Sequence, residues 1–169
     1  MSTVFFENPP PFFTGIGESP HKTQENSHTS PEVRNVKLQE HLVMALVGGF
    51  FYVLLELLYR GRSHPTMFAA GGVCFVMIGL LDRVVPGMPV LLQTVLGAGL
   101  ITAVELATGL AFNGDLRIWN YSACPFNFRG QICLQYSLLW IPLSFAAIVV
   151  DDRLRHWLFG APLPVYRWV

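Results

Sequence analysis

The sequence predicts an all-α membrane protein: a small bundle of four transmembrane helices, with a disordered N-terminal tail and an interfacial C-terminal segment. Of its 169 residues, 52% are hydrophobic and only 13% are charged, whereas soluble domains carry about 25% charged residues. The mean hydropathy is +0.44, and long apolar segments follow one another along the chain. This combination is typical of multi-pass membrane proteins.

Residues 1–37 differ from the remainder in composition. They contain five prolines and many Ser, Thr, Asn and Glu residues. A segment of this kind cannot bury enough apolar surface to offset the entropy lost on ordering. We therefore expect a disordered N-terminal tail.

The apolar segments predict helices over residues 41–59, 66–81, 90–112 and 132–150, within a membrane domain of residues 38–152. A membrane-spanning helix needs roughly 20 residues, with a range of about 17 to 25. The second segment is therefore short for a crossing. Pro142 predicts a kink in the fourth, because proline removes one backbone hydrogen bond. Residues 153–169 are basic, aromatic and interrupted by proline, which favours a segment at the membrane interface; a docking tail for a partner is the alternative.

Four crossings place both chain ends on the same side of the membrane. Lys and Arg in short loops set the orientation, with the more basic side in the cytoplasm. The terminal side carries six such residues and the other side four, which predicts that both termini are cytoplasmic.

Two carboxylates lie inside the apolar segments. Glu56 lies 15 residues after His41, where the first segment starts, and Glu105 lies 15 residues after Val90, where the third segment starts. The first and third helices of such a bundle run in the same direction, so both carboxylates are expected at a similar depth. Ionisable groups at membrane depth usually face protein or water.

The partners of these two acids differ. Arg60 follows Glu56 by four residues, the favourable order for an ion pair on a helix. Glu105 has no basic residue within one turn, so we expect it to pair across helices with Arg60 or His64, or to be kept protonated by burial. Helical spacing places each acid on a stripe with small or polar residues: Ala45, Gly49, Tyr52 and Arg60 for Glu56, and Thr94, Ala98, Thr102, Gly109 and Phe112 for Glu105.

The long connection Asn113–Gln131 lies on the same side as Arg60 and His64. Its Trp and Tyr residues are interpreted either as interfacial anchors or as part of a lid over the carboxylates. The candidate polar site comprises Glu56, Arg60, His64, Glu105, Trp119, Asn120, Tyr121, Ser122, Asn127, Arg129 and Gln131. No metal or cofactor is expected, because three cysteines without a Cys-x-x-Cys pair form no recognisable metal set.

Four stretches carry a family resemblance: "ELLYRGRSHPTMFAAGGVCF", "QTVLGAGLITAVELATGL", "WNYSACPFNFRGQICLQYSLLW" and "DDRLRHWLFG". Together they resemble the small bacterial membrane proteins catalogued as ABC-transporter type IV, from about Glu56 to the C-terminus. Asn120 and Pro65 depart from the Asp and Trp of the family pattern. The resemblance implies a multi-pass protein of the bacterial inner membrane that takes part in transport.

The leading hypothesis is a permease-like membrane component that moves an ion or small polar solute, with Glu105 as the titrating group. No Gly-x-x-x-x-Gly-Lys-Ser/Thr motif is present, so an ATPase would be a separate subunit. The alternatives are a structural or regulatory membrane subunit, and a small enzyme acting on a lipid headgroup or carrier-linked substrate, with His64 or Glu105 as base and Arg60 or Arg129 as phosphate ligand. We favour a non-enzymatic protein in contact with membrane lipid, other membrane subunits or its own copies. The zero net charge gives no sign of nucleic-acid binding.

Overall fold

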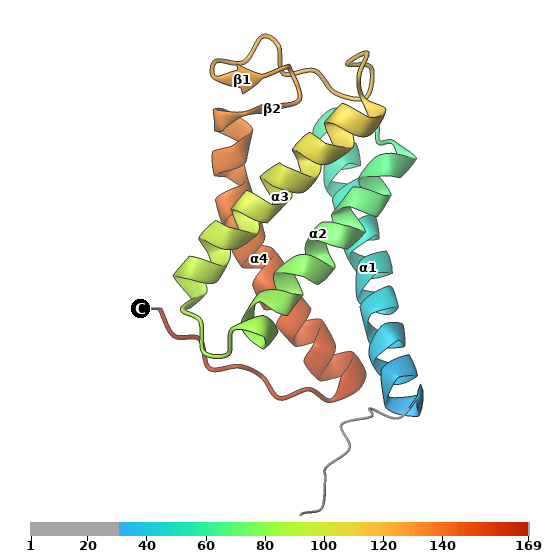
Figure 1. The fold of residues 1–169 in the computed structure, drawn as a ribbon, viewed down its shortest axis with the longest axis vertical. Helices are drawn as coiled ribbons and strands as arrows, with labels where there is room; N and C mark the ends of the chain where they lie inside the picture. Colours follow the sequence, from blue (N-terminus) through green and yellow to red (C-terminus); the bar gives the residue numbers. More distant parts are fainter. Residues whose placement is uncertain (1–30, 169) are drawn as a thin grey trace, which may run out of the picture.

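The computed structural model of the chain describes residues 31–168 and confirms an all-α membrane fold (Figure 1). Its helices are α1 (Pro31–Arg60), α2 (Pro65–Val84), α3 (Val90–Phe112) and α4 (Leu134–Phe159). Two short strands, β1 (Asn127–Phe128) and β2 (Ile132–Cys133), pair antiparallel. Each of the four helices is long and apolar enough to cross a membrane, so the protein is a multi-pass membrane protein.

The first two helices are longer than the sequence pattern suggested. Helix α1 begins at Pro31, so residues 31–37 are helical, whereas the rest of the expected tail, residues 1–30, lies outside the described residues. Proline suits the first position of a helix because its missing N–H would be unpaired there in any case. Helix α2 has 20 residues, about 30 Å of helix, which matches the hydrocarbon thickness. The expectation of a short second helix was wrong because Asp82 and Arg83 continue the helix.

Helix α4 differs from the expected 132–150 at both ends. It begins at Leu134 because Ile132 and Cys133 pair with β1. It continues through Pro142 and past Val150 to Phe159, where Gly160 adopts a left-handed conformation with φ +67°, a common helix terminus. Residues 153–159 are therefore part of the helix rather than of a separate interfacial segment.

The chain after Gly160 crosses the end of the bundle to the start of α3 (Figure 1). The Val90 N–H at the start of α3 donates to the carbonyl of Arg167 at 2.7 Å, which satisfies a backbone group that a helix leaves unpaired. The Tyr166 hydroxyl donates to Asp152 at 2.9 Å. Burial and this carboxylate raise the pKa of Tyr166 to about 12, so the hydroxyl stays a neutral donor at physiological pH. The C-terminal segment is thus docked on the bundle, and its position at the membrane surface remains a prediction.

Close packing of α1 against α2 depends on glycine. A Cβ atom at Gly72 would lie 2.5 Å from the backbone oxygen of Ala45, and one at Gly48 would collide with the side chain of Phe75. Helix α2 in turn contacts α3 and α4, and α3 packs along α4. Small residues allow this approach where van der Waals contact drives helix association.

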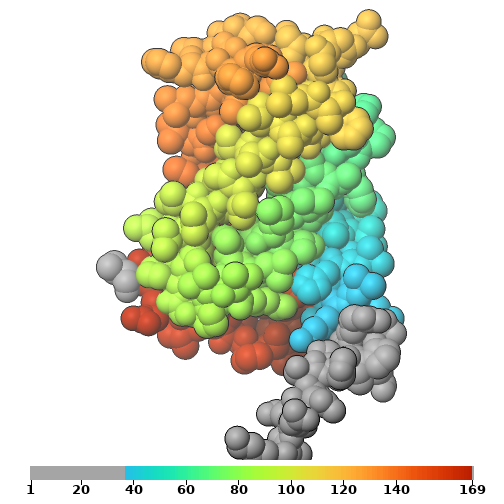
Figure 2. Space-filling model, in the orientation of Figure 1, coloured from blue at the N-terminus to red at the C-terminus, as the bar shows by residue number. Residues whose placement is uncertain are grey.

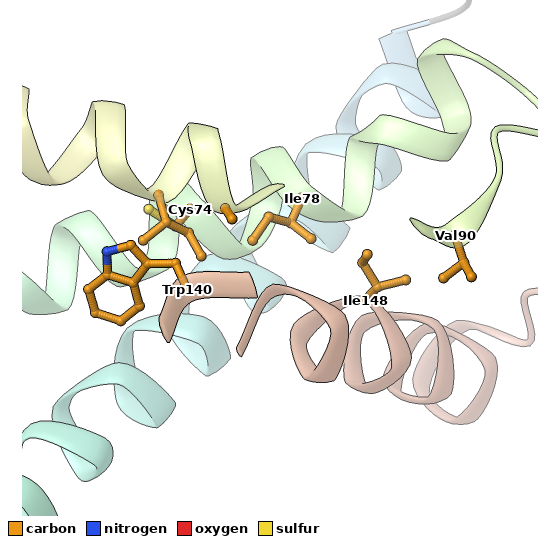
Figure 3. Close-up of a cluster of buried hydrophobic side chains, with 7 residues drawn as sticks. Cys74, Ile78, Val90, Trp140 and Ile148 are labelled. Atoms are coloured by element: carbon orange, nitrogen blue, oxygen red, sulfur yellow. The ribbon is translucent and has the colours of Figure 1, made fainter. Parts of the chain in front are cut away.

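The buried apolar core lies between α2, α3 and α4, where Cys74, Ile78, Trp140 and Ile148 meet (Figure 3). On the face shown in Figure 2, α2 and α3 form a continuous surface, and the chain after α3 covers one end of the bundle. Many large apolar side chains of α1, α3 and α4 are exposed, as expected for surfaces that meet lipid.

The predicted helical stripes mostly face inward. Glu56 and Gly49 are buried on α1, and Thr94, Ala98, Glu105 and Gly109 are buried on α3, whereas Phe112 at the end of the α3 stripe is exposed. A second row of small residues on α3, formed by Gly99, Ala103 and Ala107, points away from the other helices.

Replacing Gly72 by alanine tests the α1–α2 contact. The added methyl meets backbone rather than a flexible side chain, so we expect Gly72→Ala to destabilise the protein by about 1–3 kcal/mol. Thermal unfolding of the detergent-purified protein measures this. Gly99→Ala is the matched control, since nothing lies within 4 Å of its added Cβ. An equal loss of stability in both variants would contradict tight packing at Gly72.

Candidate functional site

The predicted ion pair between Glu56 and Arg60 is present near the C-terminal end of α1. Glu56 is only 8% exposed, and its second oxygen accepts a hydrogen bond from the Ser63 hydroxyl at 2.5 Å. The Arg60 guanidinium also donates to the carbonyl of Ile118 at 3.3 Å. The pair therefore ties the end of α1 to the α1–α2 loop and to the chain that follows α3.

Glu105 is bound by uncharged donors from two other parts of the chain. The Tyr121 hydroxyl donates to one carboxylate oxygen at 2.9 Å, and the Trp140 indole N–H donates to the other at 3.0 Å. In the part of the chain that the structure describes, no ion pair joins Glu105 to Arg60 or His64, so the first of the two alternatives, an ion pair across helices, was wrong. Burial and the nearby Glu105 carboxylate raise the pKa of Tyr121, which keeps its hydroxyl a donor. Glu105 thus joins α3 to α4 and to residues 113–131, which we call the cap.

The cap is organised around Asn113, which is fully buried. Its side-chain amide donates to the carbonyl of Trp119 at 2.7 Å and to the side-chain oxygen of Gln131 at 3.0 Å, and its own side-chain oxygen accepts from the N–H of Ile118 at 2.8 Å. Gln131 returns a bond to the Asn113 carbonyl at 2.8 Å. The Trp119 indole donates to the Gln131 carbonyl at 2.8 Å. Trp119 is 3% exposed, so it packs inside the cap and is not an interfacial anchor.

Other predicted residues shape the cap from its outer surface. Asn120 accepts from the N–H of Ser122 at 2.8 Å, a turn that an aspartate at this position would make equally well. Asn127 donates to the Cys124 carbonyl at 2.8 Å, and Arg129 lies 5.7 Å from the Phe128 ring centroid. These four polar residues, Asn120, Ser122, Asn127 and Arg129, are exposed and do not line the cavity described next.

His64 caps the start of α2. Its ring nitrogen Nδ1 accepts from the Thr66 backbone N–H at 3.3 Å. The residue is exposed and does not line the cavity. Its position therefore gives no support to a base at His64.

A cavity of about 440 Å³ lies between α1 and α4. Of the predicted residues, Glu56, Arg60 and Tyr121 line it, whereas Glu105 lies behind Tyr121 and Trp140. Helical spacing had placed the lining residue Tyr52 on the Glu56 stripe, but sequence reasoning missed the other aromatic lining residues: Tyr59, Tyr136 and Trp140. One signal was present, because Tyr136 and Trp140 are four residues apart and so share a helix face.

A second polar cluster, also missed, joins α1 and α4 at the opposite end of the bundle. Arg155 is 2% exposed and donates to Asp151 at 2.7 Å, and its guanidinium lies 3.9 Å from the Glu40 carboxylate. The i, i+4 spacing of Asp151 and Arg155 was the available signal. Among residues 31–168, no group of three or more His, Cys, Asp or Glu residues is arranged to hold a metal ion.

Comparison with known protein families agrees with this architecture. Residues 41–165 match the family described as "Putative ABC-transporter type IV". The chain belongs to this family. The match covers α1 from residue 41 onward, the other three helices, the cap and most of the C-terminal segment. No curated protein and no solved structure shows significant similarity to the chain.

Membership agrees with the resemblance carried by the four sequence stretches, and the match extends it towards the N-terminus as far as residue 41. The family description relates the chain to ABC transporters. It names neither a solute nor the residues that would bind one.

Replacing Asn113 by leucine tests the cap. The substitution leaves buried groups of Trp119, Ile118 and Gln131 without partners, so we expect a loss of about 2–4 kcal/mol in unfolding free energy. Denaturation of the detergent-solubilised protein measures it. Asn120→Ala, at an exposed cap position, is expected to cost less than about 1 kcal/mol. A similar loss in both variants would show that Asn113 has no special role.

Proposed function

We propose that the chain is the permease-like membrane component of a transport system, with its solute site in the cavity between α1 and α4. This proposal rests on the position of two buried carboxylates at the cavity. Glu56, paired with Arg60, lies in the cavity wall, and Glu105 lies directly behind it. Its volume lies in the range of about 300–1,000 Å³ that is common for ligand pockets.

Glu105 is the group that would couple protonation to movement. Its carboxylate accepts one hydrogen bond on each oxygen. The Trp140 indole can only donate and the Tyr121 hydroxyl can do both, so a proton would settle on the oxygen facing Tyr121, reverse that bond and leave Trp140 with a neutral, weaker acceptor. Protonation would thereby loosen α4 and the cap, which border the cavity. A change in one charge would in this way alter access to the solute site.

The partner of this component is a separate ATPase, since the sequence contains no phosphate-binding loop of its own. We place the protein in the bacterial inner membrane with both termini in the cytoplasm. The start of α1 and the C-terminal segment lie at the same end of the bundle (Figure 1). The cap and the polar end of the cavity would then face the outer side of the membrane.

Purification of the tagged chain from its own membranes tests the transport proposal. We expect an ATPase to copurify, and Glu105→Gln to lower the ATP hydrolysis per molecule of the complex to background, a larger effect than any loss of membrane abundance. Asp115→Asn removes an exposed carboxylate outside the site and is the matched control. Recovery of the intact chain with no ATP-hydrolysing partner would overturn the proposal.

A structural or regulatory subunit is the second candidate, and one observation favours it. Both buried carboxylates are already bonded on each oxygen by side chains of the same chain. Carboxylates satisfied in this way can serve to hold helices and cap together. Their neutralisation would then reduce the amount of folded protein and leave the activity per molecule unchanged.

The ion pair of α1 separates these candidates. Arg60 is 23% exposed on its side chain, so we expect Glu56→Gln and Arg60→Gln each to lower the unfolding free energy by about 2 kcal/mol, less than for a fully buried pair. Membrane abundance and ATP hydrolysis per molecule are measured together for these variants and for Glu105→Gln. If Glu105→Gln also loses only abundance, the structural candidate is supported over the transport component.

A further inference from the structure

The cavity between α1 and α4 is the larger part of a longer apolar trench. A second cavity, of about 230 Å³, adjoins it and shares Tyr52, Leu55, Leu143 and Ala146 as lining residues. The two together follow α1 from Gly48 to Arg60 and α4 from Tyr136 to Val150. At 1.5 Å per residue, this is a length of roughly 18–21 Å. We call these two cavities together the trench.

The trench is unsuited to water or to a polar solute over most of its length. Away from Arg60 its walls and floor are formed by apolar side chains, among them Phe51, Leu55, Phe75 and Ile78. A buried water needs two to four polar partners, which these walls do not supply. Because α1 and α4 are both long enough to span a membrane, the trench lies at the depth of lipid hydrocarbon.

Contacts across both ends of the trench decide what can enter it. The Tyr59 and Tyr136 hydroxyls are 3.1 Å apart at the cap end, and Arg155 lies 3.9 Å from Glu40 beyond the other end. Between these contacts the trench is lined by the exposed residues Leu55, Leu139 and Ala146. A helix of about 10–12 Å diameter would have to break these contacts, whereas a single hydrocarbon chain would not.

One end of the trench offers hydrogen-bond donors. Arg60 has five N–H donors, of which the structure uses one toward Glu56 and one toward Ile118. In the Tyr59–Tyr136 pair one hydroxyl donates to the other, so the second O–H is free to donate elsewhere. Such donors suit the ester and phosphate oxygens of a headgroup, since arginine matches phosphate geometry well.

We infer that the trench binds one acyl chain of a bilayer phospholipid, with the lipid's ester and phosphate oxygens at Arg60, Tyr59 and Tyr136. The inference rests on the proposed function, because it uses the same cavity. It identifies the solute class as a membrane amphiphile rather than an ion. The lipid enters laterally between α1 and α4. The cap closes the bundle above it.

Photolabelling tests the occupant of the trench. The full chain is reconstituted in phosphatidylethanolamine–phosphatidylglycerol vesicles that contain a phosphatidylglycerol with a diazirine on its acyl chain, and crosslinks are mapped by peptide mass spectrometry. We expect labels to concentrate on trench residues such as Leu55 and Ala146, relative to exposed α3 residues such as Leu92. Ala146→Phe fills the trench and should lower this labelling to the level of α3. Ala103→Phe, on the outward face of α3, should not change it.

Native mass spectrometry after detergent exchange supplies a second measurement that does not depend on the Ala146→Phe variant folding. We expect the wild-type chain to retain a phospholipid, and Tyr136→Phe to weaken retention by about three- to tenfold, the effect of one lost hydrogen bond. Three results would each overturn the inference. They are labelling spread evenly over the trench and α3, retention of a free fatty acid instead of a phospholipid, and crosslinks to a second copy across the trench.

The two proposals fail separately. If the chain copurifies with no ATPase but holds phospholipid in the trench, the transport proposal is contradicted and the lipid site is supported. If the complex hydrolyses ATP but the trench is labelled no more strongly than α3, only the lipid site is contradicted.

Discussion

The carboxylate of Glu105 is the interaction on which the rest of the structure depends. It lies in an apolar bundle where an unpaired polar group costs several kcal/mol, and it is satisfied only when Tyr121 of the cap and Trp140 of α4 both reach it. The Tyr121 bond holds the cap over the end of α3 together with the bonds of Asn113, and the Trp140 bond joins α3 to α4. They also place two aromatic walls of the cavity. Fold and candidate site therefore share one hydrogen-bonded centre.

Helix α1 stands apart from this centre. It packs mainly on α2, through glycines that let the two backbones approach. It meets α4 through side chains near each end, the Tyr59–Tyr136 hydroxyls at the cap and Glu40–Arg155 at the other end. Between these contacts the rings of Tyr52 and Trp140 approach with centroids 6.4 Å apart. The trench separates the rest of the two helices, and Figure 1 shows their cap ends well apart. The trench is a consequence of this arrangement, because no side chain of either helix fills the space.

The polar groups of the bundle gather at its two ends, with the apolar core of Figure 3 between them. At the cap end, Glu56 is bound by Arg60 and Ser63, and Glu105 is bound by an aromatic hydroxyl and an indole. At the other end, Asp151 and Arg155 form a second buried pair. A transport component and a purely structural subunit can both contain such buried ion pairs. The two candidates differ in whether Glu105 changes its hydrogen bonds during function. Such a change would follow from protonation of its carboxylate.

Periodicity and composition determined much of this protein: an all-α membrane fold, the i, i+4 pair of Glu56 and Arg60, and an inward position for Glu105. These follow from local spacing, since helix length, hydropathy and side-chain direction depend on neighbouring residues. The partners of Glu105, the burial of Asn113 and Trp119, and the extension of α4 to Phe159 were decided by tertiary structure. Each depends on groups far apart in the sequence, such as Trp140, which is 35 residues from Glu105. The trench was also decided by tertiary structure. The space between α1 and α4 stays unfilled because α2 holds α1 away from α4, and no local sequence pattern predicts this arrangement.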